Sequence, residues 1–335
     1  MSSRTSNAIA WNILLAALVV ALPCVLAIPS YPQPGTGQKA SAGTPSAQET
    51  FAAPEQAVQA LIQAAEQFDV PALKRIFGPD GVDIVTTSDA VQDKNRATLF
   101  AAKAREKTSV TMDPKTHNHA TLLVGNGDWP FPVPIVKKGG KWYFDSKAGR
   151  EEILARRIGT NELDAIQVCR GFVEAQHEYA SEIHDDSGIN QYAQRIISTP
   201  GKQDGLVWKN ADGSLGGPIS EGVARAIEQG YTSRTEPFHG YYFKVLKGQG
   251  PAAPLGEMDF VIKGMMIGGF ALVAAPAEYR VTGVQMFIVS HDGIVYQKDW
   301  GPDTLQAFKD MERYNPDKTW HRTGDEWPTD VAAAE

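Results

Sequence analysis

The sequence contains almost no cysteine, with Cys24 and Cys169 as the two thiols among 335 residues. A disulfide framework or a cysteine-based metal site needs more thiols than this. Cys169 lies among apolar neighbours that include Phe172 and Val173. We therefore expect it to be a buried thiol without a reactive role.

The sequence also lacks an excess of positive charge. Its 32 Lys and Arg are outnumbered by 39 Asp and Glu, and the formal net charge is −7. Acidic and basic residues are mixed along the chain, so no basic face is expected. This composition argues against a nucleic-acid-binding surface and against an anionic-membrane surface.

Catalytic and cofactor motifs are missing as well, so no catalytic residue and no cofactor is predicted. No Gly-x-Ser-x-Gly element is present, and the glycine-rich stretches 248–256 and 264–269 lack the Lys-Ser/Thr of a phosphate-binding loop. Ser290, His291 and Asp292 are consecutive, and neighbours on a tight turn cannot align as a catalytic triad.

Two pairs of histidines lie close enough in the sequence to be compared with metal-ligand patterns. His117 and His119 would face one side of a strand, but no third ligand is evident nearby, so no metal site is predicted. The cluster around His177 and His184 has a seven-residue spacing, which differs from the His-Glu-x-x-His pattern. It is interpreted as a solvated helix end.

One long apolar run is present, at the N-terminus. Arg4 precedes an apolar stretch from Ile13 to Ala27, which predicts a secretory signal peptide over residues 1–27 with cleavage after Ala27. The alternative is an uncleaved membrane anchor. Removing Arg4 changes the net charge from −7 to −8. Residues 28–50 are rich in Pro, Gly, Ser and Gln and are expected to form a disordered linker.

An α+β domain is predicted over residues 51–159. Helical periodicity begins at Pro54 and recurs at 71–77 and 90–106. Strands, in which side chains alternate between two faces, are then expected at 109–112, 120–124, 133–136 and 141–144. A turn at Lys138-Gly139-Gly140 is expected to join the last two strands as a hairpin. This order of elements resembles the cone-shaped fold of the nuclear transport factor 2-like superfamily, in which helices pack into a curved antiparallel sheet.

A second domain is predicted over residues 160–322. A helix over 148–158 is expected to end at Gly159, and Thr160 or Asn161 is expected to cap a new helix that buries Leu163 and Ile166. Gln176 falls near the buried stripe and would need a partner. A short helix is expected at 220–229, followed by an antiparallel meander with strands at 241–246, 260–263, 270–274, 284–289 and 294–299 and a turn at 290–293. A closing helix at 304–311 completes this domain, and residues 323–335 form a loose tail.

Five spaced motifs resemble a family of exported bacterial proteins known as domain of unknown function 2950. They are Asp128-Trp129-Pro130-Phe131-Pro132, the run 156–163, the run 198–206, His239-Gly240-Tyr241-Tyr242 and the run 315–320. Val207 stands where the family usually has Tyr. The resemblance carries no established activity to this chain.

The second domain also resembles the headgroup of type IV pilins and pseudopilins. The segments that carry this likeness are 165–193, Gly240-Tyr241-Tyr242-Phe243, Ala274-Ala275-Pro276, Tyr279, Gly283, Phe287 and 292–295. A pilin has an apolar helix half before the headgroup, whereas Lys147 to Arg157 is charged here. We therefore expect a pilin-headgroup-like domain that does not polymerise.

Three groups of residues are candidates for binding. Trp129, Phe131 and Trp142 could wall a pocket in the first domain, with Asp145 as a base. Arg156, Arg157, Asn161 and Glu162 flank the domain boundary and would bind an anion or lock the two domains together. Asp204, Trp208 and His239 lie in loops, where they would line a ligand cleft or stabilise turns.

The leading hypothesis is a non-enzymatic envelope protein that binds a protein partner. The alternative is a small-ligand-binding protein or enzyme that uses a pocket in the first domain. Contact with a membrane is expected only through an uncleaved N-terminal segment. The oligomeric state does not follow from the sequence.

Overall fold

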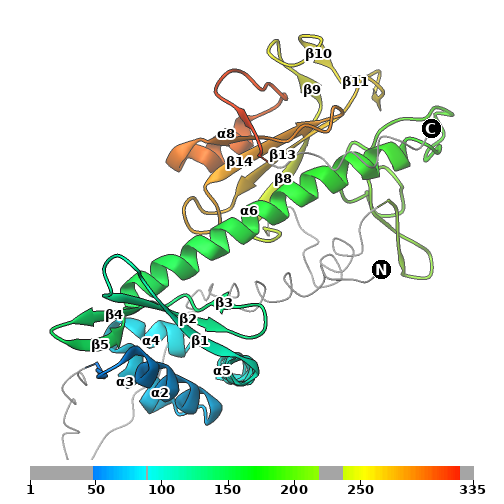
Figure 1. Ribbon diagram of the computed structural model, residues 1–335. Helices are drawn as coiled ribbons and strands as arrows, with labels where there is room; N and C mark the ends of the chain where they lie inside the picture. The colour runs from blue at the N-terminus through cyan, green and yellow to red at the C-terminus, as the bar shows by residue number, and fades with distance from the viewer. Residues whose placement is uncertain (1–47, 88–89, 219–236, 325–335) are drawn as a thin grey trace, which may run out of the picture. The chain divides into compact units, whose positions relative to one another are not determined.

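The computed structural model describes residues 48–87, 90–218 and 237–324, and its elements are drawn in Figure 1. The chain divides into two compact units, residues 1–156 and 157–335. Helices and antiparallel sheets make up both units, which confirms the α+β class. The expected signal peptide, nearly all of the linker, a helix expected at 220–229 and most of the tail lie outside the described residues.

Helices precede strands in the first unit, as the sequence predicts. The helices are α2 (Pro54–Glu66), α3 (Val70–Phe77), the 3-10 turn η2 (Pro79–Gly81), α4 (Val82–Val85) and α5 (Ala90–Glu106). The strands are β1 (Thr108–Met112), β2 (His119–Val124), β3 (Trp129–Pro130), β4 (Ile135–Lys138) and β5 (Lys141–Phe144). They form an antiparallel sheet in the order β1-β2-β4-β5, with β3 paired to β2. The expected helix bounds at 71–77 and 90–106 are confirmed within one residue.

The core of this unit lies between the helices and one face of the sheet. Leu61, Ile76, Leu122 and Phe144 are all buried there. Because strand side chains alternate between faces, Trp142 and Phe144 are buried while Tyr143 between them is half-buried on the other face. The predicted alternation of strand 141–144 is confirmed.

A single 34-residue helix, α6 (Ser146–Tyr179), runs through the expected boundary (Figure 1). The prediction that one helix ends at Gly159 and another begins at Thr160 is wrong. Gly159 has no positive φ, so it does not adopt the left-handed conformation that ends a helix. Leu163, which was expected to be buried, is 56% exposed.

Replacing Gly159 with Ala is expected to stabilise the protein by about 0.5–1 kcal/mol, because Ala loses less conformational entropy than Gly in a helix. A Cβ at this position meets no atom within 4 Å. Urea denaturation measures the change, and Gly171→Ala on the same helix, with similar open space, is the matched control. A loss of stability at Gly159 alone would show that the helix ends there.

The second unit combines the C-terminal half of α6 with a five-stranded antiparallel sheet. The sheet has the order β16-β15-β14-β13-β8. The elements are β6 (Trp208–Lys209), β7 (Leu215–Gly216), β8 (Tyr241–Leu246), β9 (Gly248–Gln249), β10 (Met258–Asp259), β11 (Val261–Ile262), β12 (Met265–Met266), β13 (Ala271–Pro276), β14 (Gln285–Ser290), β15 (Tyr296–Asp299), η3 (Gly301–Asp303), α8 (Thr304–Asp310) and β16 (His321–Arg322). The expected strand at 241–246 and the expected turn at 290–293 are confirmed.

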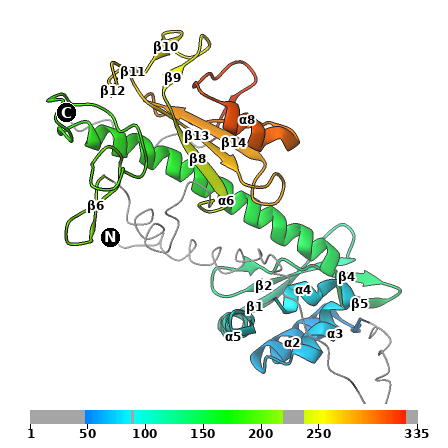
Figure 2. The same ribbon diagram turned by 180° about the vertical axis from the view of Figure 1, so that it is seen from behind.

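Helices cover both faces of this sheet. All six residues of the central strand β13 are buried, which requires packing on both sides. The views in Figures 1 and 2 show the sheet between α6 and α8. On the α8 side, Lys244 of β8 donates to the Phe308 and Lys309 carbonyls at the end of that helix, at 2.6 and 3.0 Å.

Gln176 of α6 faces the interior and is fully buried. Its amide forms two hydrogen bonds of 2.8 Å with the main chain of Ala193, one to the carbonyl and one from the N–H. Cys169, about two turns earlier on the same helix, is also fully buried. Burial raises the pKa of its thiol to about 12. The expected partner for Gln176 and the expected buried Cys169 are both confirmed.

Candidate functional site

The loop Ser198–Gly205 of the second unit, called the 198–205 loop from here on, has an exposed tip with a defined conformation. The Lys202 N–H donates to the Thr199 carbonyl at 2.9 Å, which closes a four-residue turn. Pro200 occupies the second position and Gly201, with φ +78°, the third. These are the residues that a type II turn requires. The sequence Thr-Pro-Gly-Lys therefore fixes the shape of the tip locally.

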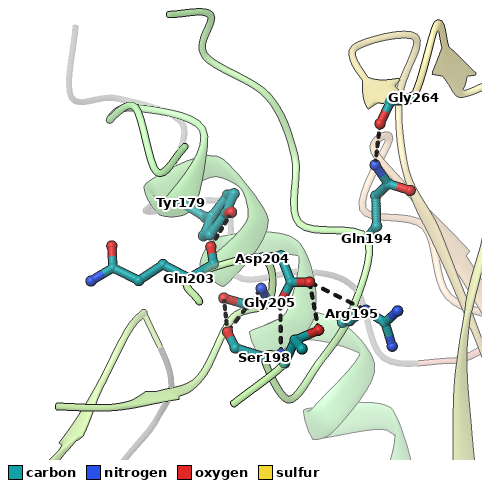
Figure 3. Close-up of polar contacts among 9 residues, drawn as sticks. Tyr179, Gln194, Arg195, Ser198, Gln203, Asp204, Gly205 and Gly264 are labelled. Carbon is teal, nitrogen blue, oxygen red and sulfur yellow. Dashed lines mark hydrogen bonds and ion pairs between the residues drawn. The ribbon is translucent and has the colours of Figure 1, made fainter. Parts of the chain in front are cut away.

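Asp204 closes the base of this loop (Figure 3). Its two carboxylate oxygens accept hydrogen bonds from the N–H and the hydroxyl of Thr199, both at 2.7 Å, and the Arg195 Nε lies 3.5 Å away. Burial opposes ionisation of Asp204, but the Thr199 hydrogen bonds and the Arg195 charge outweigh it and lower the pKa. Asp204 was predicted as a loop residue with either a ligand-binding or a turn-forming role, and the geometry assigns it the second.

A second set of hydrogen bonds, between Ser198 and Gly205, also holds the base of the loop. The Ser198 hydroxyl accepts a hydrogen bond from the Gly205 N–H at 2.9 Å and donates to the Gly205 carbonyl at 3.2 Å. The Ser198 N–H in turn donates to the Val207 carbonyl at 2.8 Å. The base of the loop is thus held by side chains and main chain together, while Pro200, Gly201 and Lys202 remain exposed.

Aromatic side chains support the loop from the end of α6. The Tyr179 hydroxyl donates to the Gln203 carbonyl at 2.5 Å. The His184 ring stacks on Tyr179 at 3.9 Å between centroids, and Trp208 lies 5.4 Å from His184. Burial, reinforced by the charges of Asp185 and Asp204, raises the pKa of Tyr179 to about 12, so the phenol keeps its proton at neutral pH.

The tautomer of His184 follows from its contacts. Its Nε2 lies 2.9 Å from the Tyr179 carbonyl, and a carbonyl oxygen only accepts, so Nε2 carries a proton. His184 was interpreted from the sequence as part of a solvated helix end. Most of that cluster is exposed near the end of α6, as interpreted: His177, Glu178, Asp185 and Asp186. The His184 ring differs, because it is half-buried, stacks on Tyr179 and lies near Trp208.

Replacing Asp204 with Asn is expected to loosen the loop, because one of the two accepting oxygens becomes an NH2 group that only donates, and because the amide offers no charge to Arg195. The wild-type carboxyl has a lowered pKa, so its contribution is complete above the ordinary Asp pKa of about 3.9 and is lost as the pH falls through the folded value. The Thr199 amide resonance, followed by NMR from pH 7 downward, should shift in acid for the wild type. It should not titrate in Asp204→Asn, and an unchanged titration in the variant would contradict the assignment.

Asn161, Glu162 and His239 come together at the junction between α6 and the sheet of the second unit. The Asn161 amide donates to the Thr282 carbonyl at 2.8 Å. The Glu162 Oε1 accepts the N–H groups of Val284 and Gln285 at 2.8 and 3.0 Å. Asn161 and Glu162 were expected to bind an anion or to lock two domains together, and these hydrogen-bond partners instead lie within the second unit.

His239 joins this junction through Asp164, which the sequence did not single out. The two side chains are 2.6 Å apart, from Nδ1 to Oδ2. His239 (φ +46°) and Gly240 (φ +75°) form a two-residue turn, since Phe238 and Tyr241 exchange both main-chain hydrogen bonds. His239 therefore fixes a hairpin tip to α6 and does not lie with Asp204 and Trp208 in the described contacts.

Arg156 belongs to a different group of contacts, in the first unit. Its guanidinium lies 5.2 Å from the Trp129 ring centroid and donates at 2.7 Å to both the Pro130 carbonyl and Glu152. The adjacent Arg157 has a buried Nε without a hydrogen-bond partner among the described residues. The four predicted boundary residues 156, 157, 161 and 162 therefore do not form one cluster.

The aromatic residues expected to wall a pocket pack inside the first unit, and two of them, Trp129 and Phe131, contact other rings. Phe131 lies 5.2 Å from Phe100 and 6.3 Å from Phe77. Trp142 is 5% exposed and is covered by Lys137. The carboxylate of Asp145, considered as a base, accepts the Ala148 N–H at 3.1 Å and so caps the start of α6.

The remaining candidates form no metal or catalytic arrangement in the part of the chain that the structure describes. His117 and His119 are exposed, and no group of three potential ligands is found among residues 48–87, 90–218 and 237–324. The Ser290 hydroxyl donates to Asp292 directly, at 3.0 Å, within the turn. His291 does not mediate between them.

Sequence reasoning missed Asp164 as the partner of His239 and Thr199 as the partner of Asp204. Thr199 could have been found, because Thr-Pro-Gly is a type II turn signature and a carboxylate just beyond such a turn often accepts its free N–H groups. Asp164 had no comparable local signal, since its partner is 75 residues away.

These observations define an α+β protein whose second unit packs a long helix on an antiparallel meander and ends that helix beside an exposed, hydrogen-bonded loop. The model of the family described as protein of unknown function (DUF2950) matches residues 48–323. The chain belongs to this family, as its five motifs predicted. No curated protein and no solved structure shows significant similarity to it.

Proposed function

We propose that this chain is an exported protein of the bacterial envelope that binds another protein, and that the 198–205 loop is its contact surface. The observation that carries the proposal is the exposed tip held by hydrogen bonds. Residues 200–203 are all exposed, so burial of side chains does not hold them in place. They are ordered by the turn hydrogen bond and by the contacts of Asp204, Ser198 and Tyr179.

A preformed loop favours recognition for an energetic reason. Ordering a backbone residue costs about 1–2 kcal/mol, and a binding loop that is ordered in advance does not incur this cost on association. Lys202 and Gln203 extend from the tip, and the half-buried Trp208 lies at the base near His184. Trp is one of the residue types that are enriched at protein interfaces.

The proposed envelope location rests on the sequence of residues 1–27, which reads as a signal peptide. Among the residues that the structure describes, no helix is long and apolar enough to cross a membrane. After cleavage at Ala27, residues 28–50 would form the N-terminal segment that precedes the first folded unit.

A pilin-headgroup-like second unit is part of the proposal. The C-terminal half of α6 packs on a meander in which β13, β14, β15 and β16 are neighbours in chain order, which supports it. The N-terminal half of α6 carries Lys147, Arg150 and Glu151 where a pilin has an apolar helix. The proposed role is therefore that of a single interaction module.

Site-specific photocrosslinking in intact cells tests the proposed contact surface. A photoreactive amino acid replaces Lys202, and the control variant carries it at Lys115, an exposed position on a hydrogen-bonded turn of the first unit. We expect one discrete adduct with an envelope protein from position 202 and none from position 115. Equal adducts from both positions, or no adduct together with substrate turnover by the purified protein, would overturn the proposal.

A further inference from the structure

Strand β1 leaves one edge of the first unit's sheet unpaired. It pairs with β2 over all five of its residues, and with no other strand in the described part of the chain. Its sequence, Thr-Ser-Val-Thr-Met, contains two β-branched threonines and a valine, with no charge and no proline. Edge strands usually carry charges, prolines or bulges that prevent pairing with another chain. This strand has none of these.

The main-chain groups that point away from β2 can be identified. The Asp113 N–H donates to the His119 carbonyl, and the Gly125 N–H donates to the Lys107 carbonyl, both at 2.9 Å. Hydrogen-bonded and non-hydrogen-bonded positions alternate along an antiparallel pair, so odd-numbered residues direct their main chain toward β2. Thr108, Val110 and Met112 therefore direct their N–H and C=O groups outward.

We infer that a second copy of this chain pairs with β1, antiparallel and with its two-fold axis at Val110. This register places Val110 opposite Val110, and Thr108 opposite Met112 of the second copy. All three outward-directed residues on each strand then find main-chain partners, which gives six hydrogen bonds between the copies. The inference concerns the first unit and does not depend on the function proposed for the 198–205 loop.

Charge complementarity selects a second copy rather than an unrelated strand. With the axis at Val110, Lys107 lies opposite Asp113 of the other copy, at both ends of the paired segment. Lys107 and Asp113 occupy non-hydrogen-bonded positions toward the second copy, where side chains approach most closely. The Lys107 ammonium also pairs with Asp128 at 2.7 Å, so it would bridge two carboxylates.

Apolar burial supports the same register. Val110 and Met112 are half-buried and pack at the margin of the first unit's core. Pairing at the two-fold axis covers each Val110 with its counterpart. A five-residue strand pair lies at the small end of protein interfaces, so the dimer should be weak and should form with increasing concentration.

Disulfide trapping tests the register directly. The full chain carries Cys24→Ser, and Cys169 is fully buried, so neither native thiol interferes. Ser109 and Thr111 would face each other across copies as a non-hydrogen-bonded pair, with Cα atoms about 4.5 Å apart, within the range of a disulfide. A mixture of Ser109→Cys and Thr111→Cys chains should form a crosslinked dimer on mild oxidation. Each variant alone should not, because its own cysteines would lie more than about 7 Å apart.

Sedimentation velocity over a range of concentrations gives the second measurement. The wild-type chain should shift from monomer to dimer, and Val110→Lys, which places two ammonium groups together at the axis, should remain monomeric. Thr121→Lys on β2 is the charge-matched control and should dimerise, and circular dichroism checks that all variants fold. A wild-type chain that stays monomeric at every concentration, or equal crosslinking in the single-variant samples, overturns the inference.

Discussion

Replacing Gln176 with Ala is expected to lower the free energy of unfolding by about 3 kcal/mol or more. The change leaves the N–H and C=O of Ala193 without partners, and each unsatisfied buried polar group costs about 1–3 kcal/mol. Ala193 is 1% exposed, so water cannot replace the lost amide without rearrangement of the chain. Urea denaturation followed by circular dichroism measures the loss.

Two further variants separate the possible causes. Gln176→Leu retains most of the side-chain volume, and should still cost most of the same energy if the hydrogen bonds dominate. Gln194→Ala removes another loop amide, which donates at 2.6 Å to the Gly264 carbonyl in a half-buried position. That change should cost less than about 1 kcal/mol. A stable Gln176→Leu variant would show that the loss comes from the cavity.

Gln176 also shows what can be predicted from a local pattern. Its place on the buried stripe of a helix follows from a 3.6-residue period, and a buried amide must find a partner. The partner's identity does not follow, because Ala193 offers only main-chain groups and carries no signal in its side chain. The strand at 241–246 was predicted correctly for a related reason, since alternation and turn residues are local properties.

The helix boundary was predicted wrongly because two different structures share one local pattern. Gly159 followed by Thr160, Asn161 and Glu162 has the composition of a helix end and a new cap. In the structure, Asn161 and Glu162 use their side chains on the main chain of residues 282–285, more than a hundred residues away. A side chain that stabilises a distant loop therefore looked like a local capping residue.

The candidate site was predicted in part. Asp204 was selected as a loop residue and lies in the 198–205 loop. Trp208 was also expected in a loop, but it begins strand β6 and lies near His184. The contacts of this region with Tyr179 and His184 form because the chain after α6 returns to the end of that helix. The region 180–197 has no regular strand or helix, so no periodic pattern in it indicates this return. The loop's own turn was readable from Thr-Pro-Gly, while its anchors were not.

Replacing Gly283 with Ala is expected to destabilise the second unit by about 3 kcal/mol, at the upper end of the cost of overpacking a core. A Cβ at Gly283 would lie 2.1 Å from the hydroxyl oxygen of Tyr241 and 2.6 Å from its ring. Tyr241 is 1% exposed, and its hydroxyl donates to the Gln285 carbonyl at 2.9 Å. The ring cannot move aside without losing this hydrogen bond, and thermal unfolding measures the resulting loss.

A double-mutant cycle attributes that loss to the Tyr241 contact. Tyr241→Leu removes the atoms that a new Cβ would meet, so the loss in Gly283→Ala/Tyr241→Leu should be clearly smaller than the sum of the single losses. Additive losses would contradict the steric explanation. Tyr241 follows directly after the turn in which His239 contacts Asp164, so a displaced ring should also disturb that contact. The His239 ring resonances should therefore shift in Gly283→Ala, and should return toward wild type in the double variant.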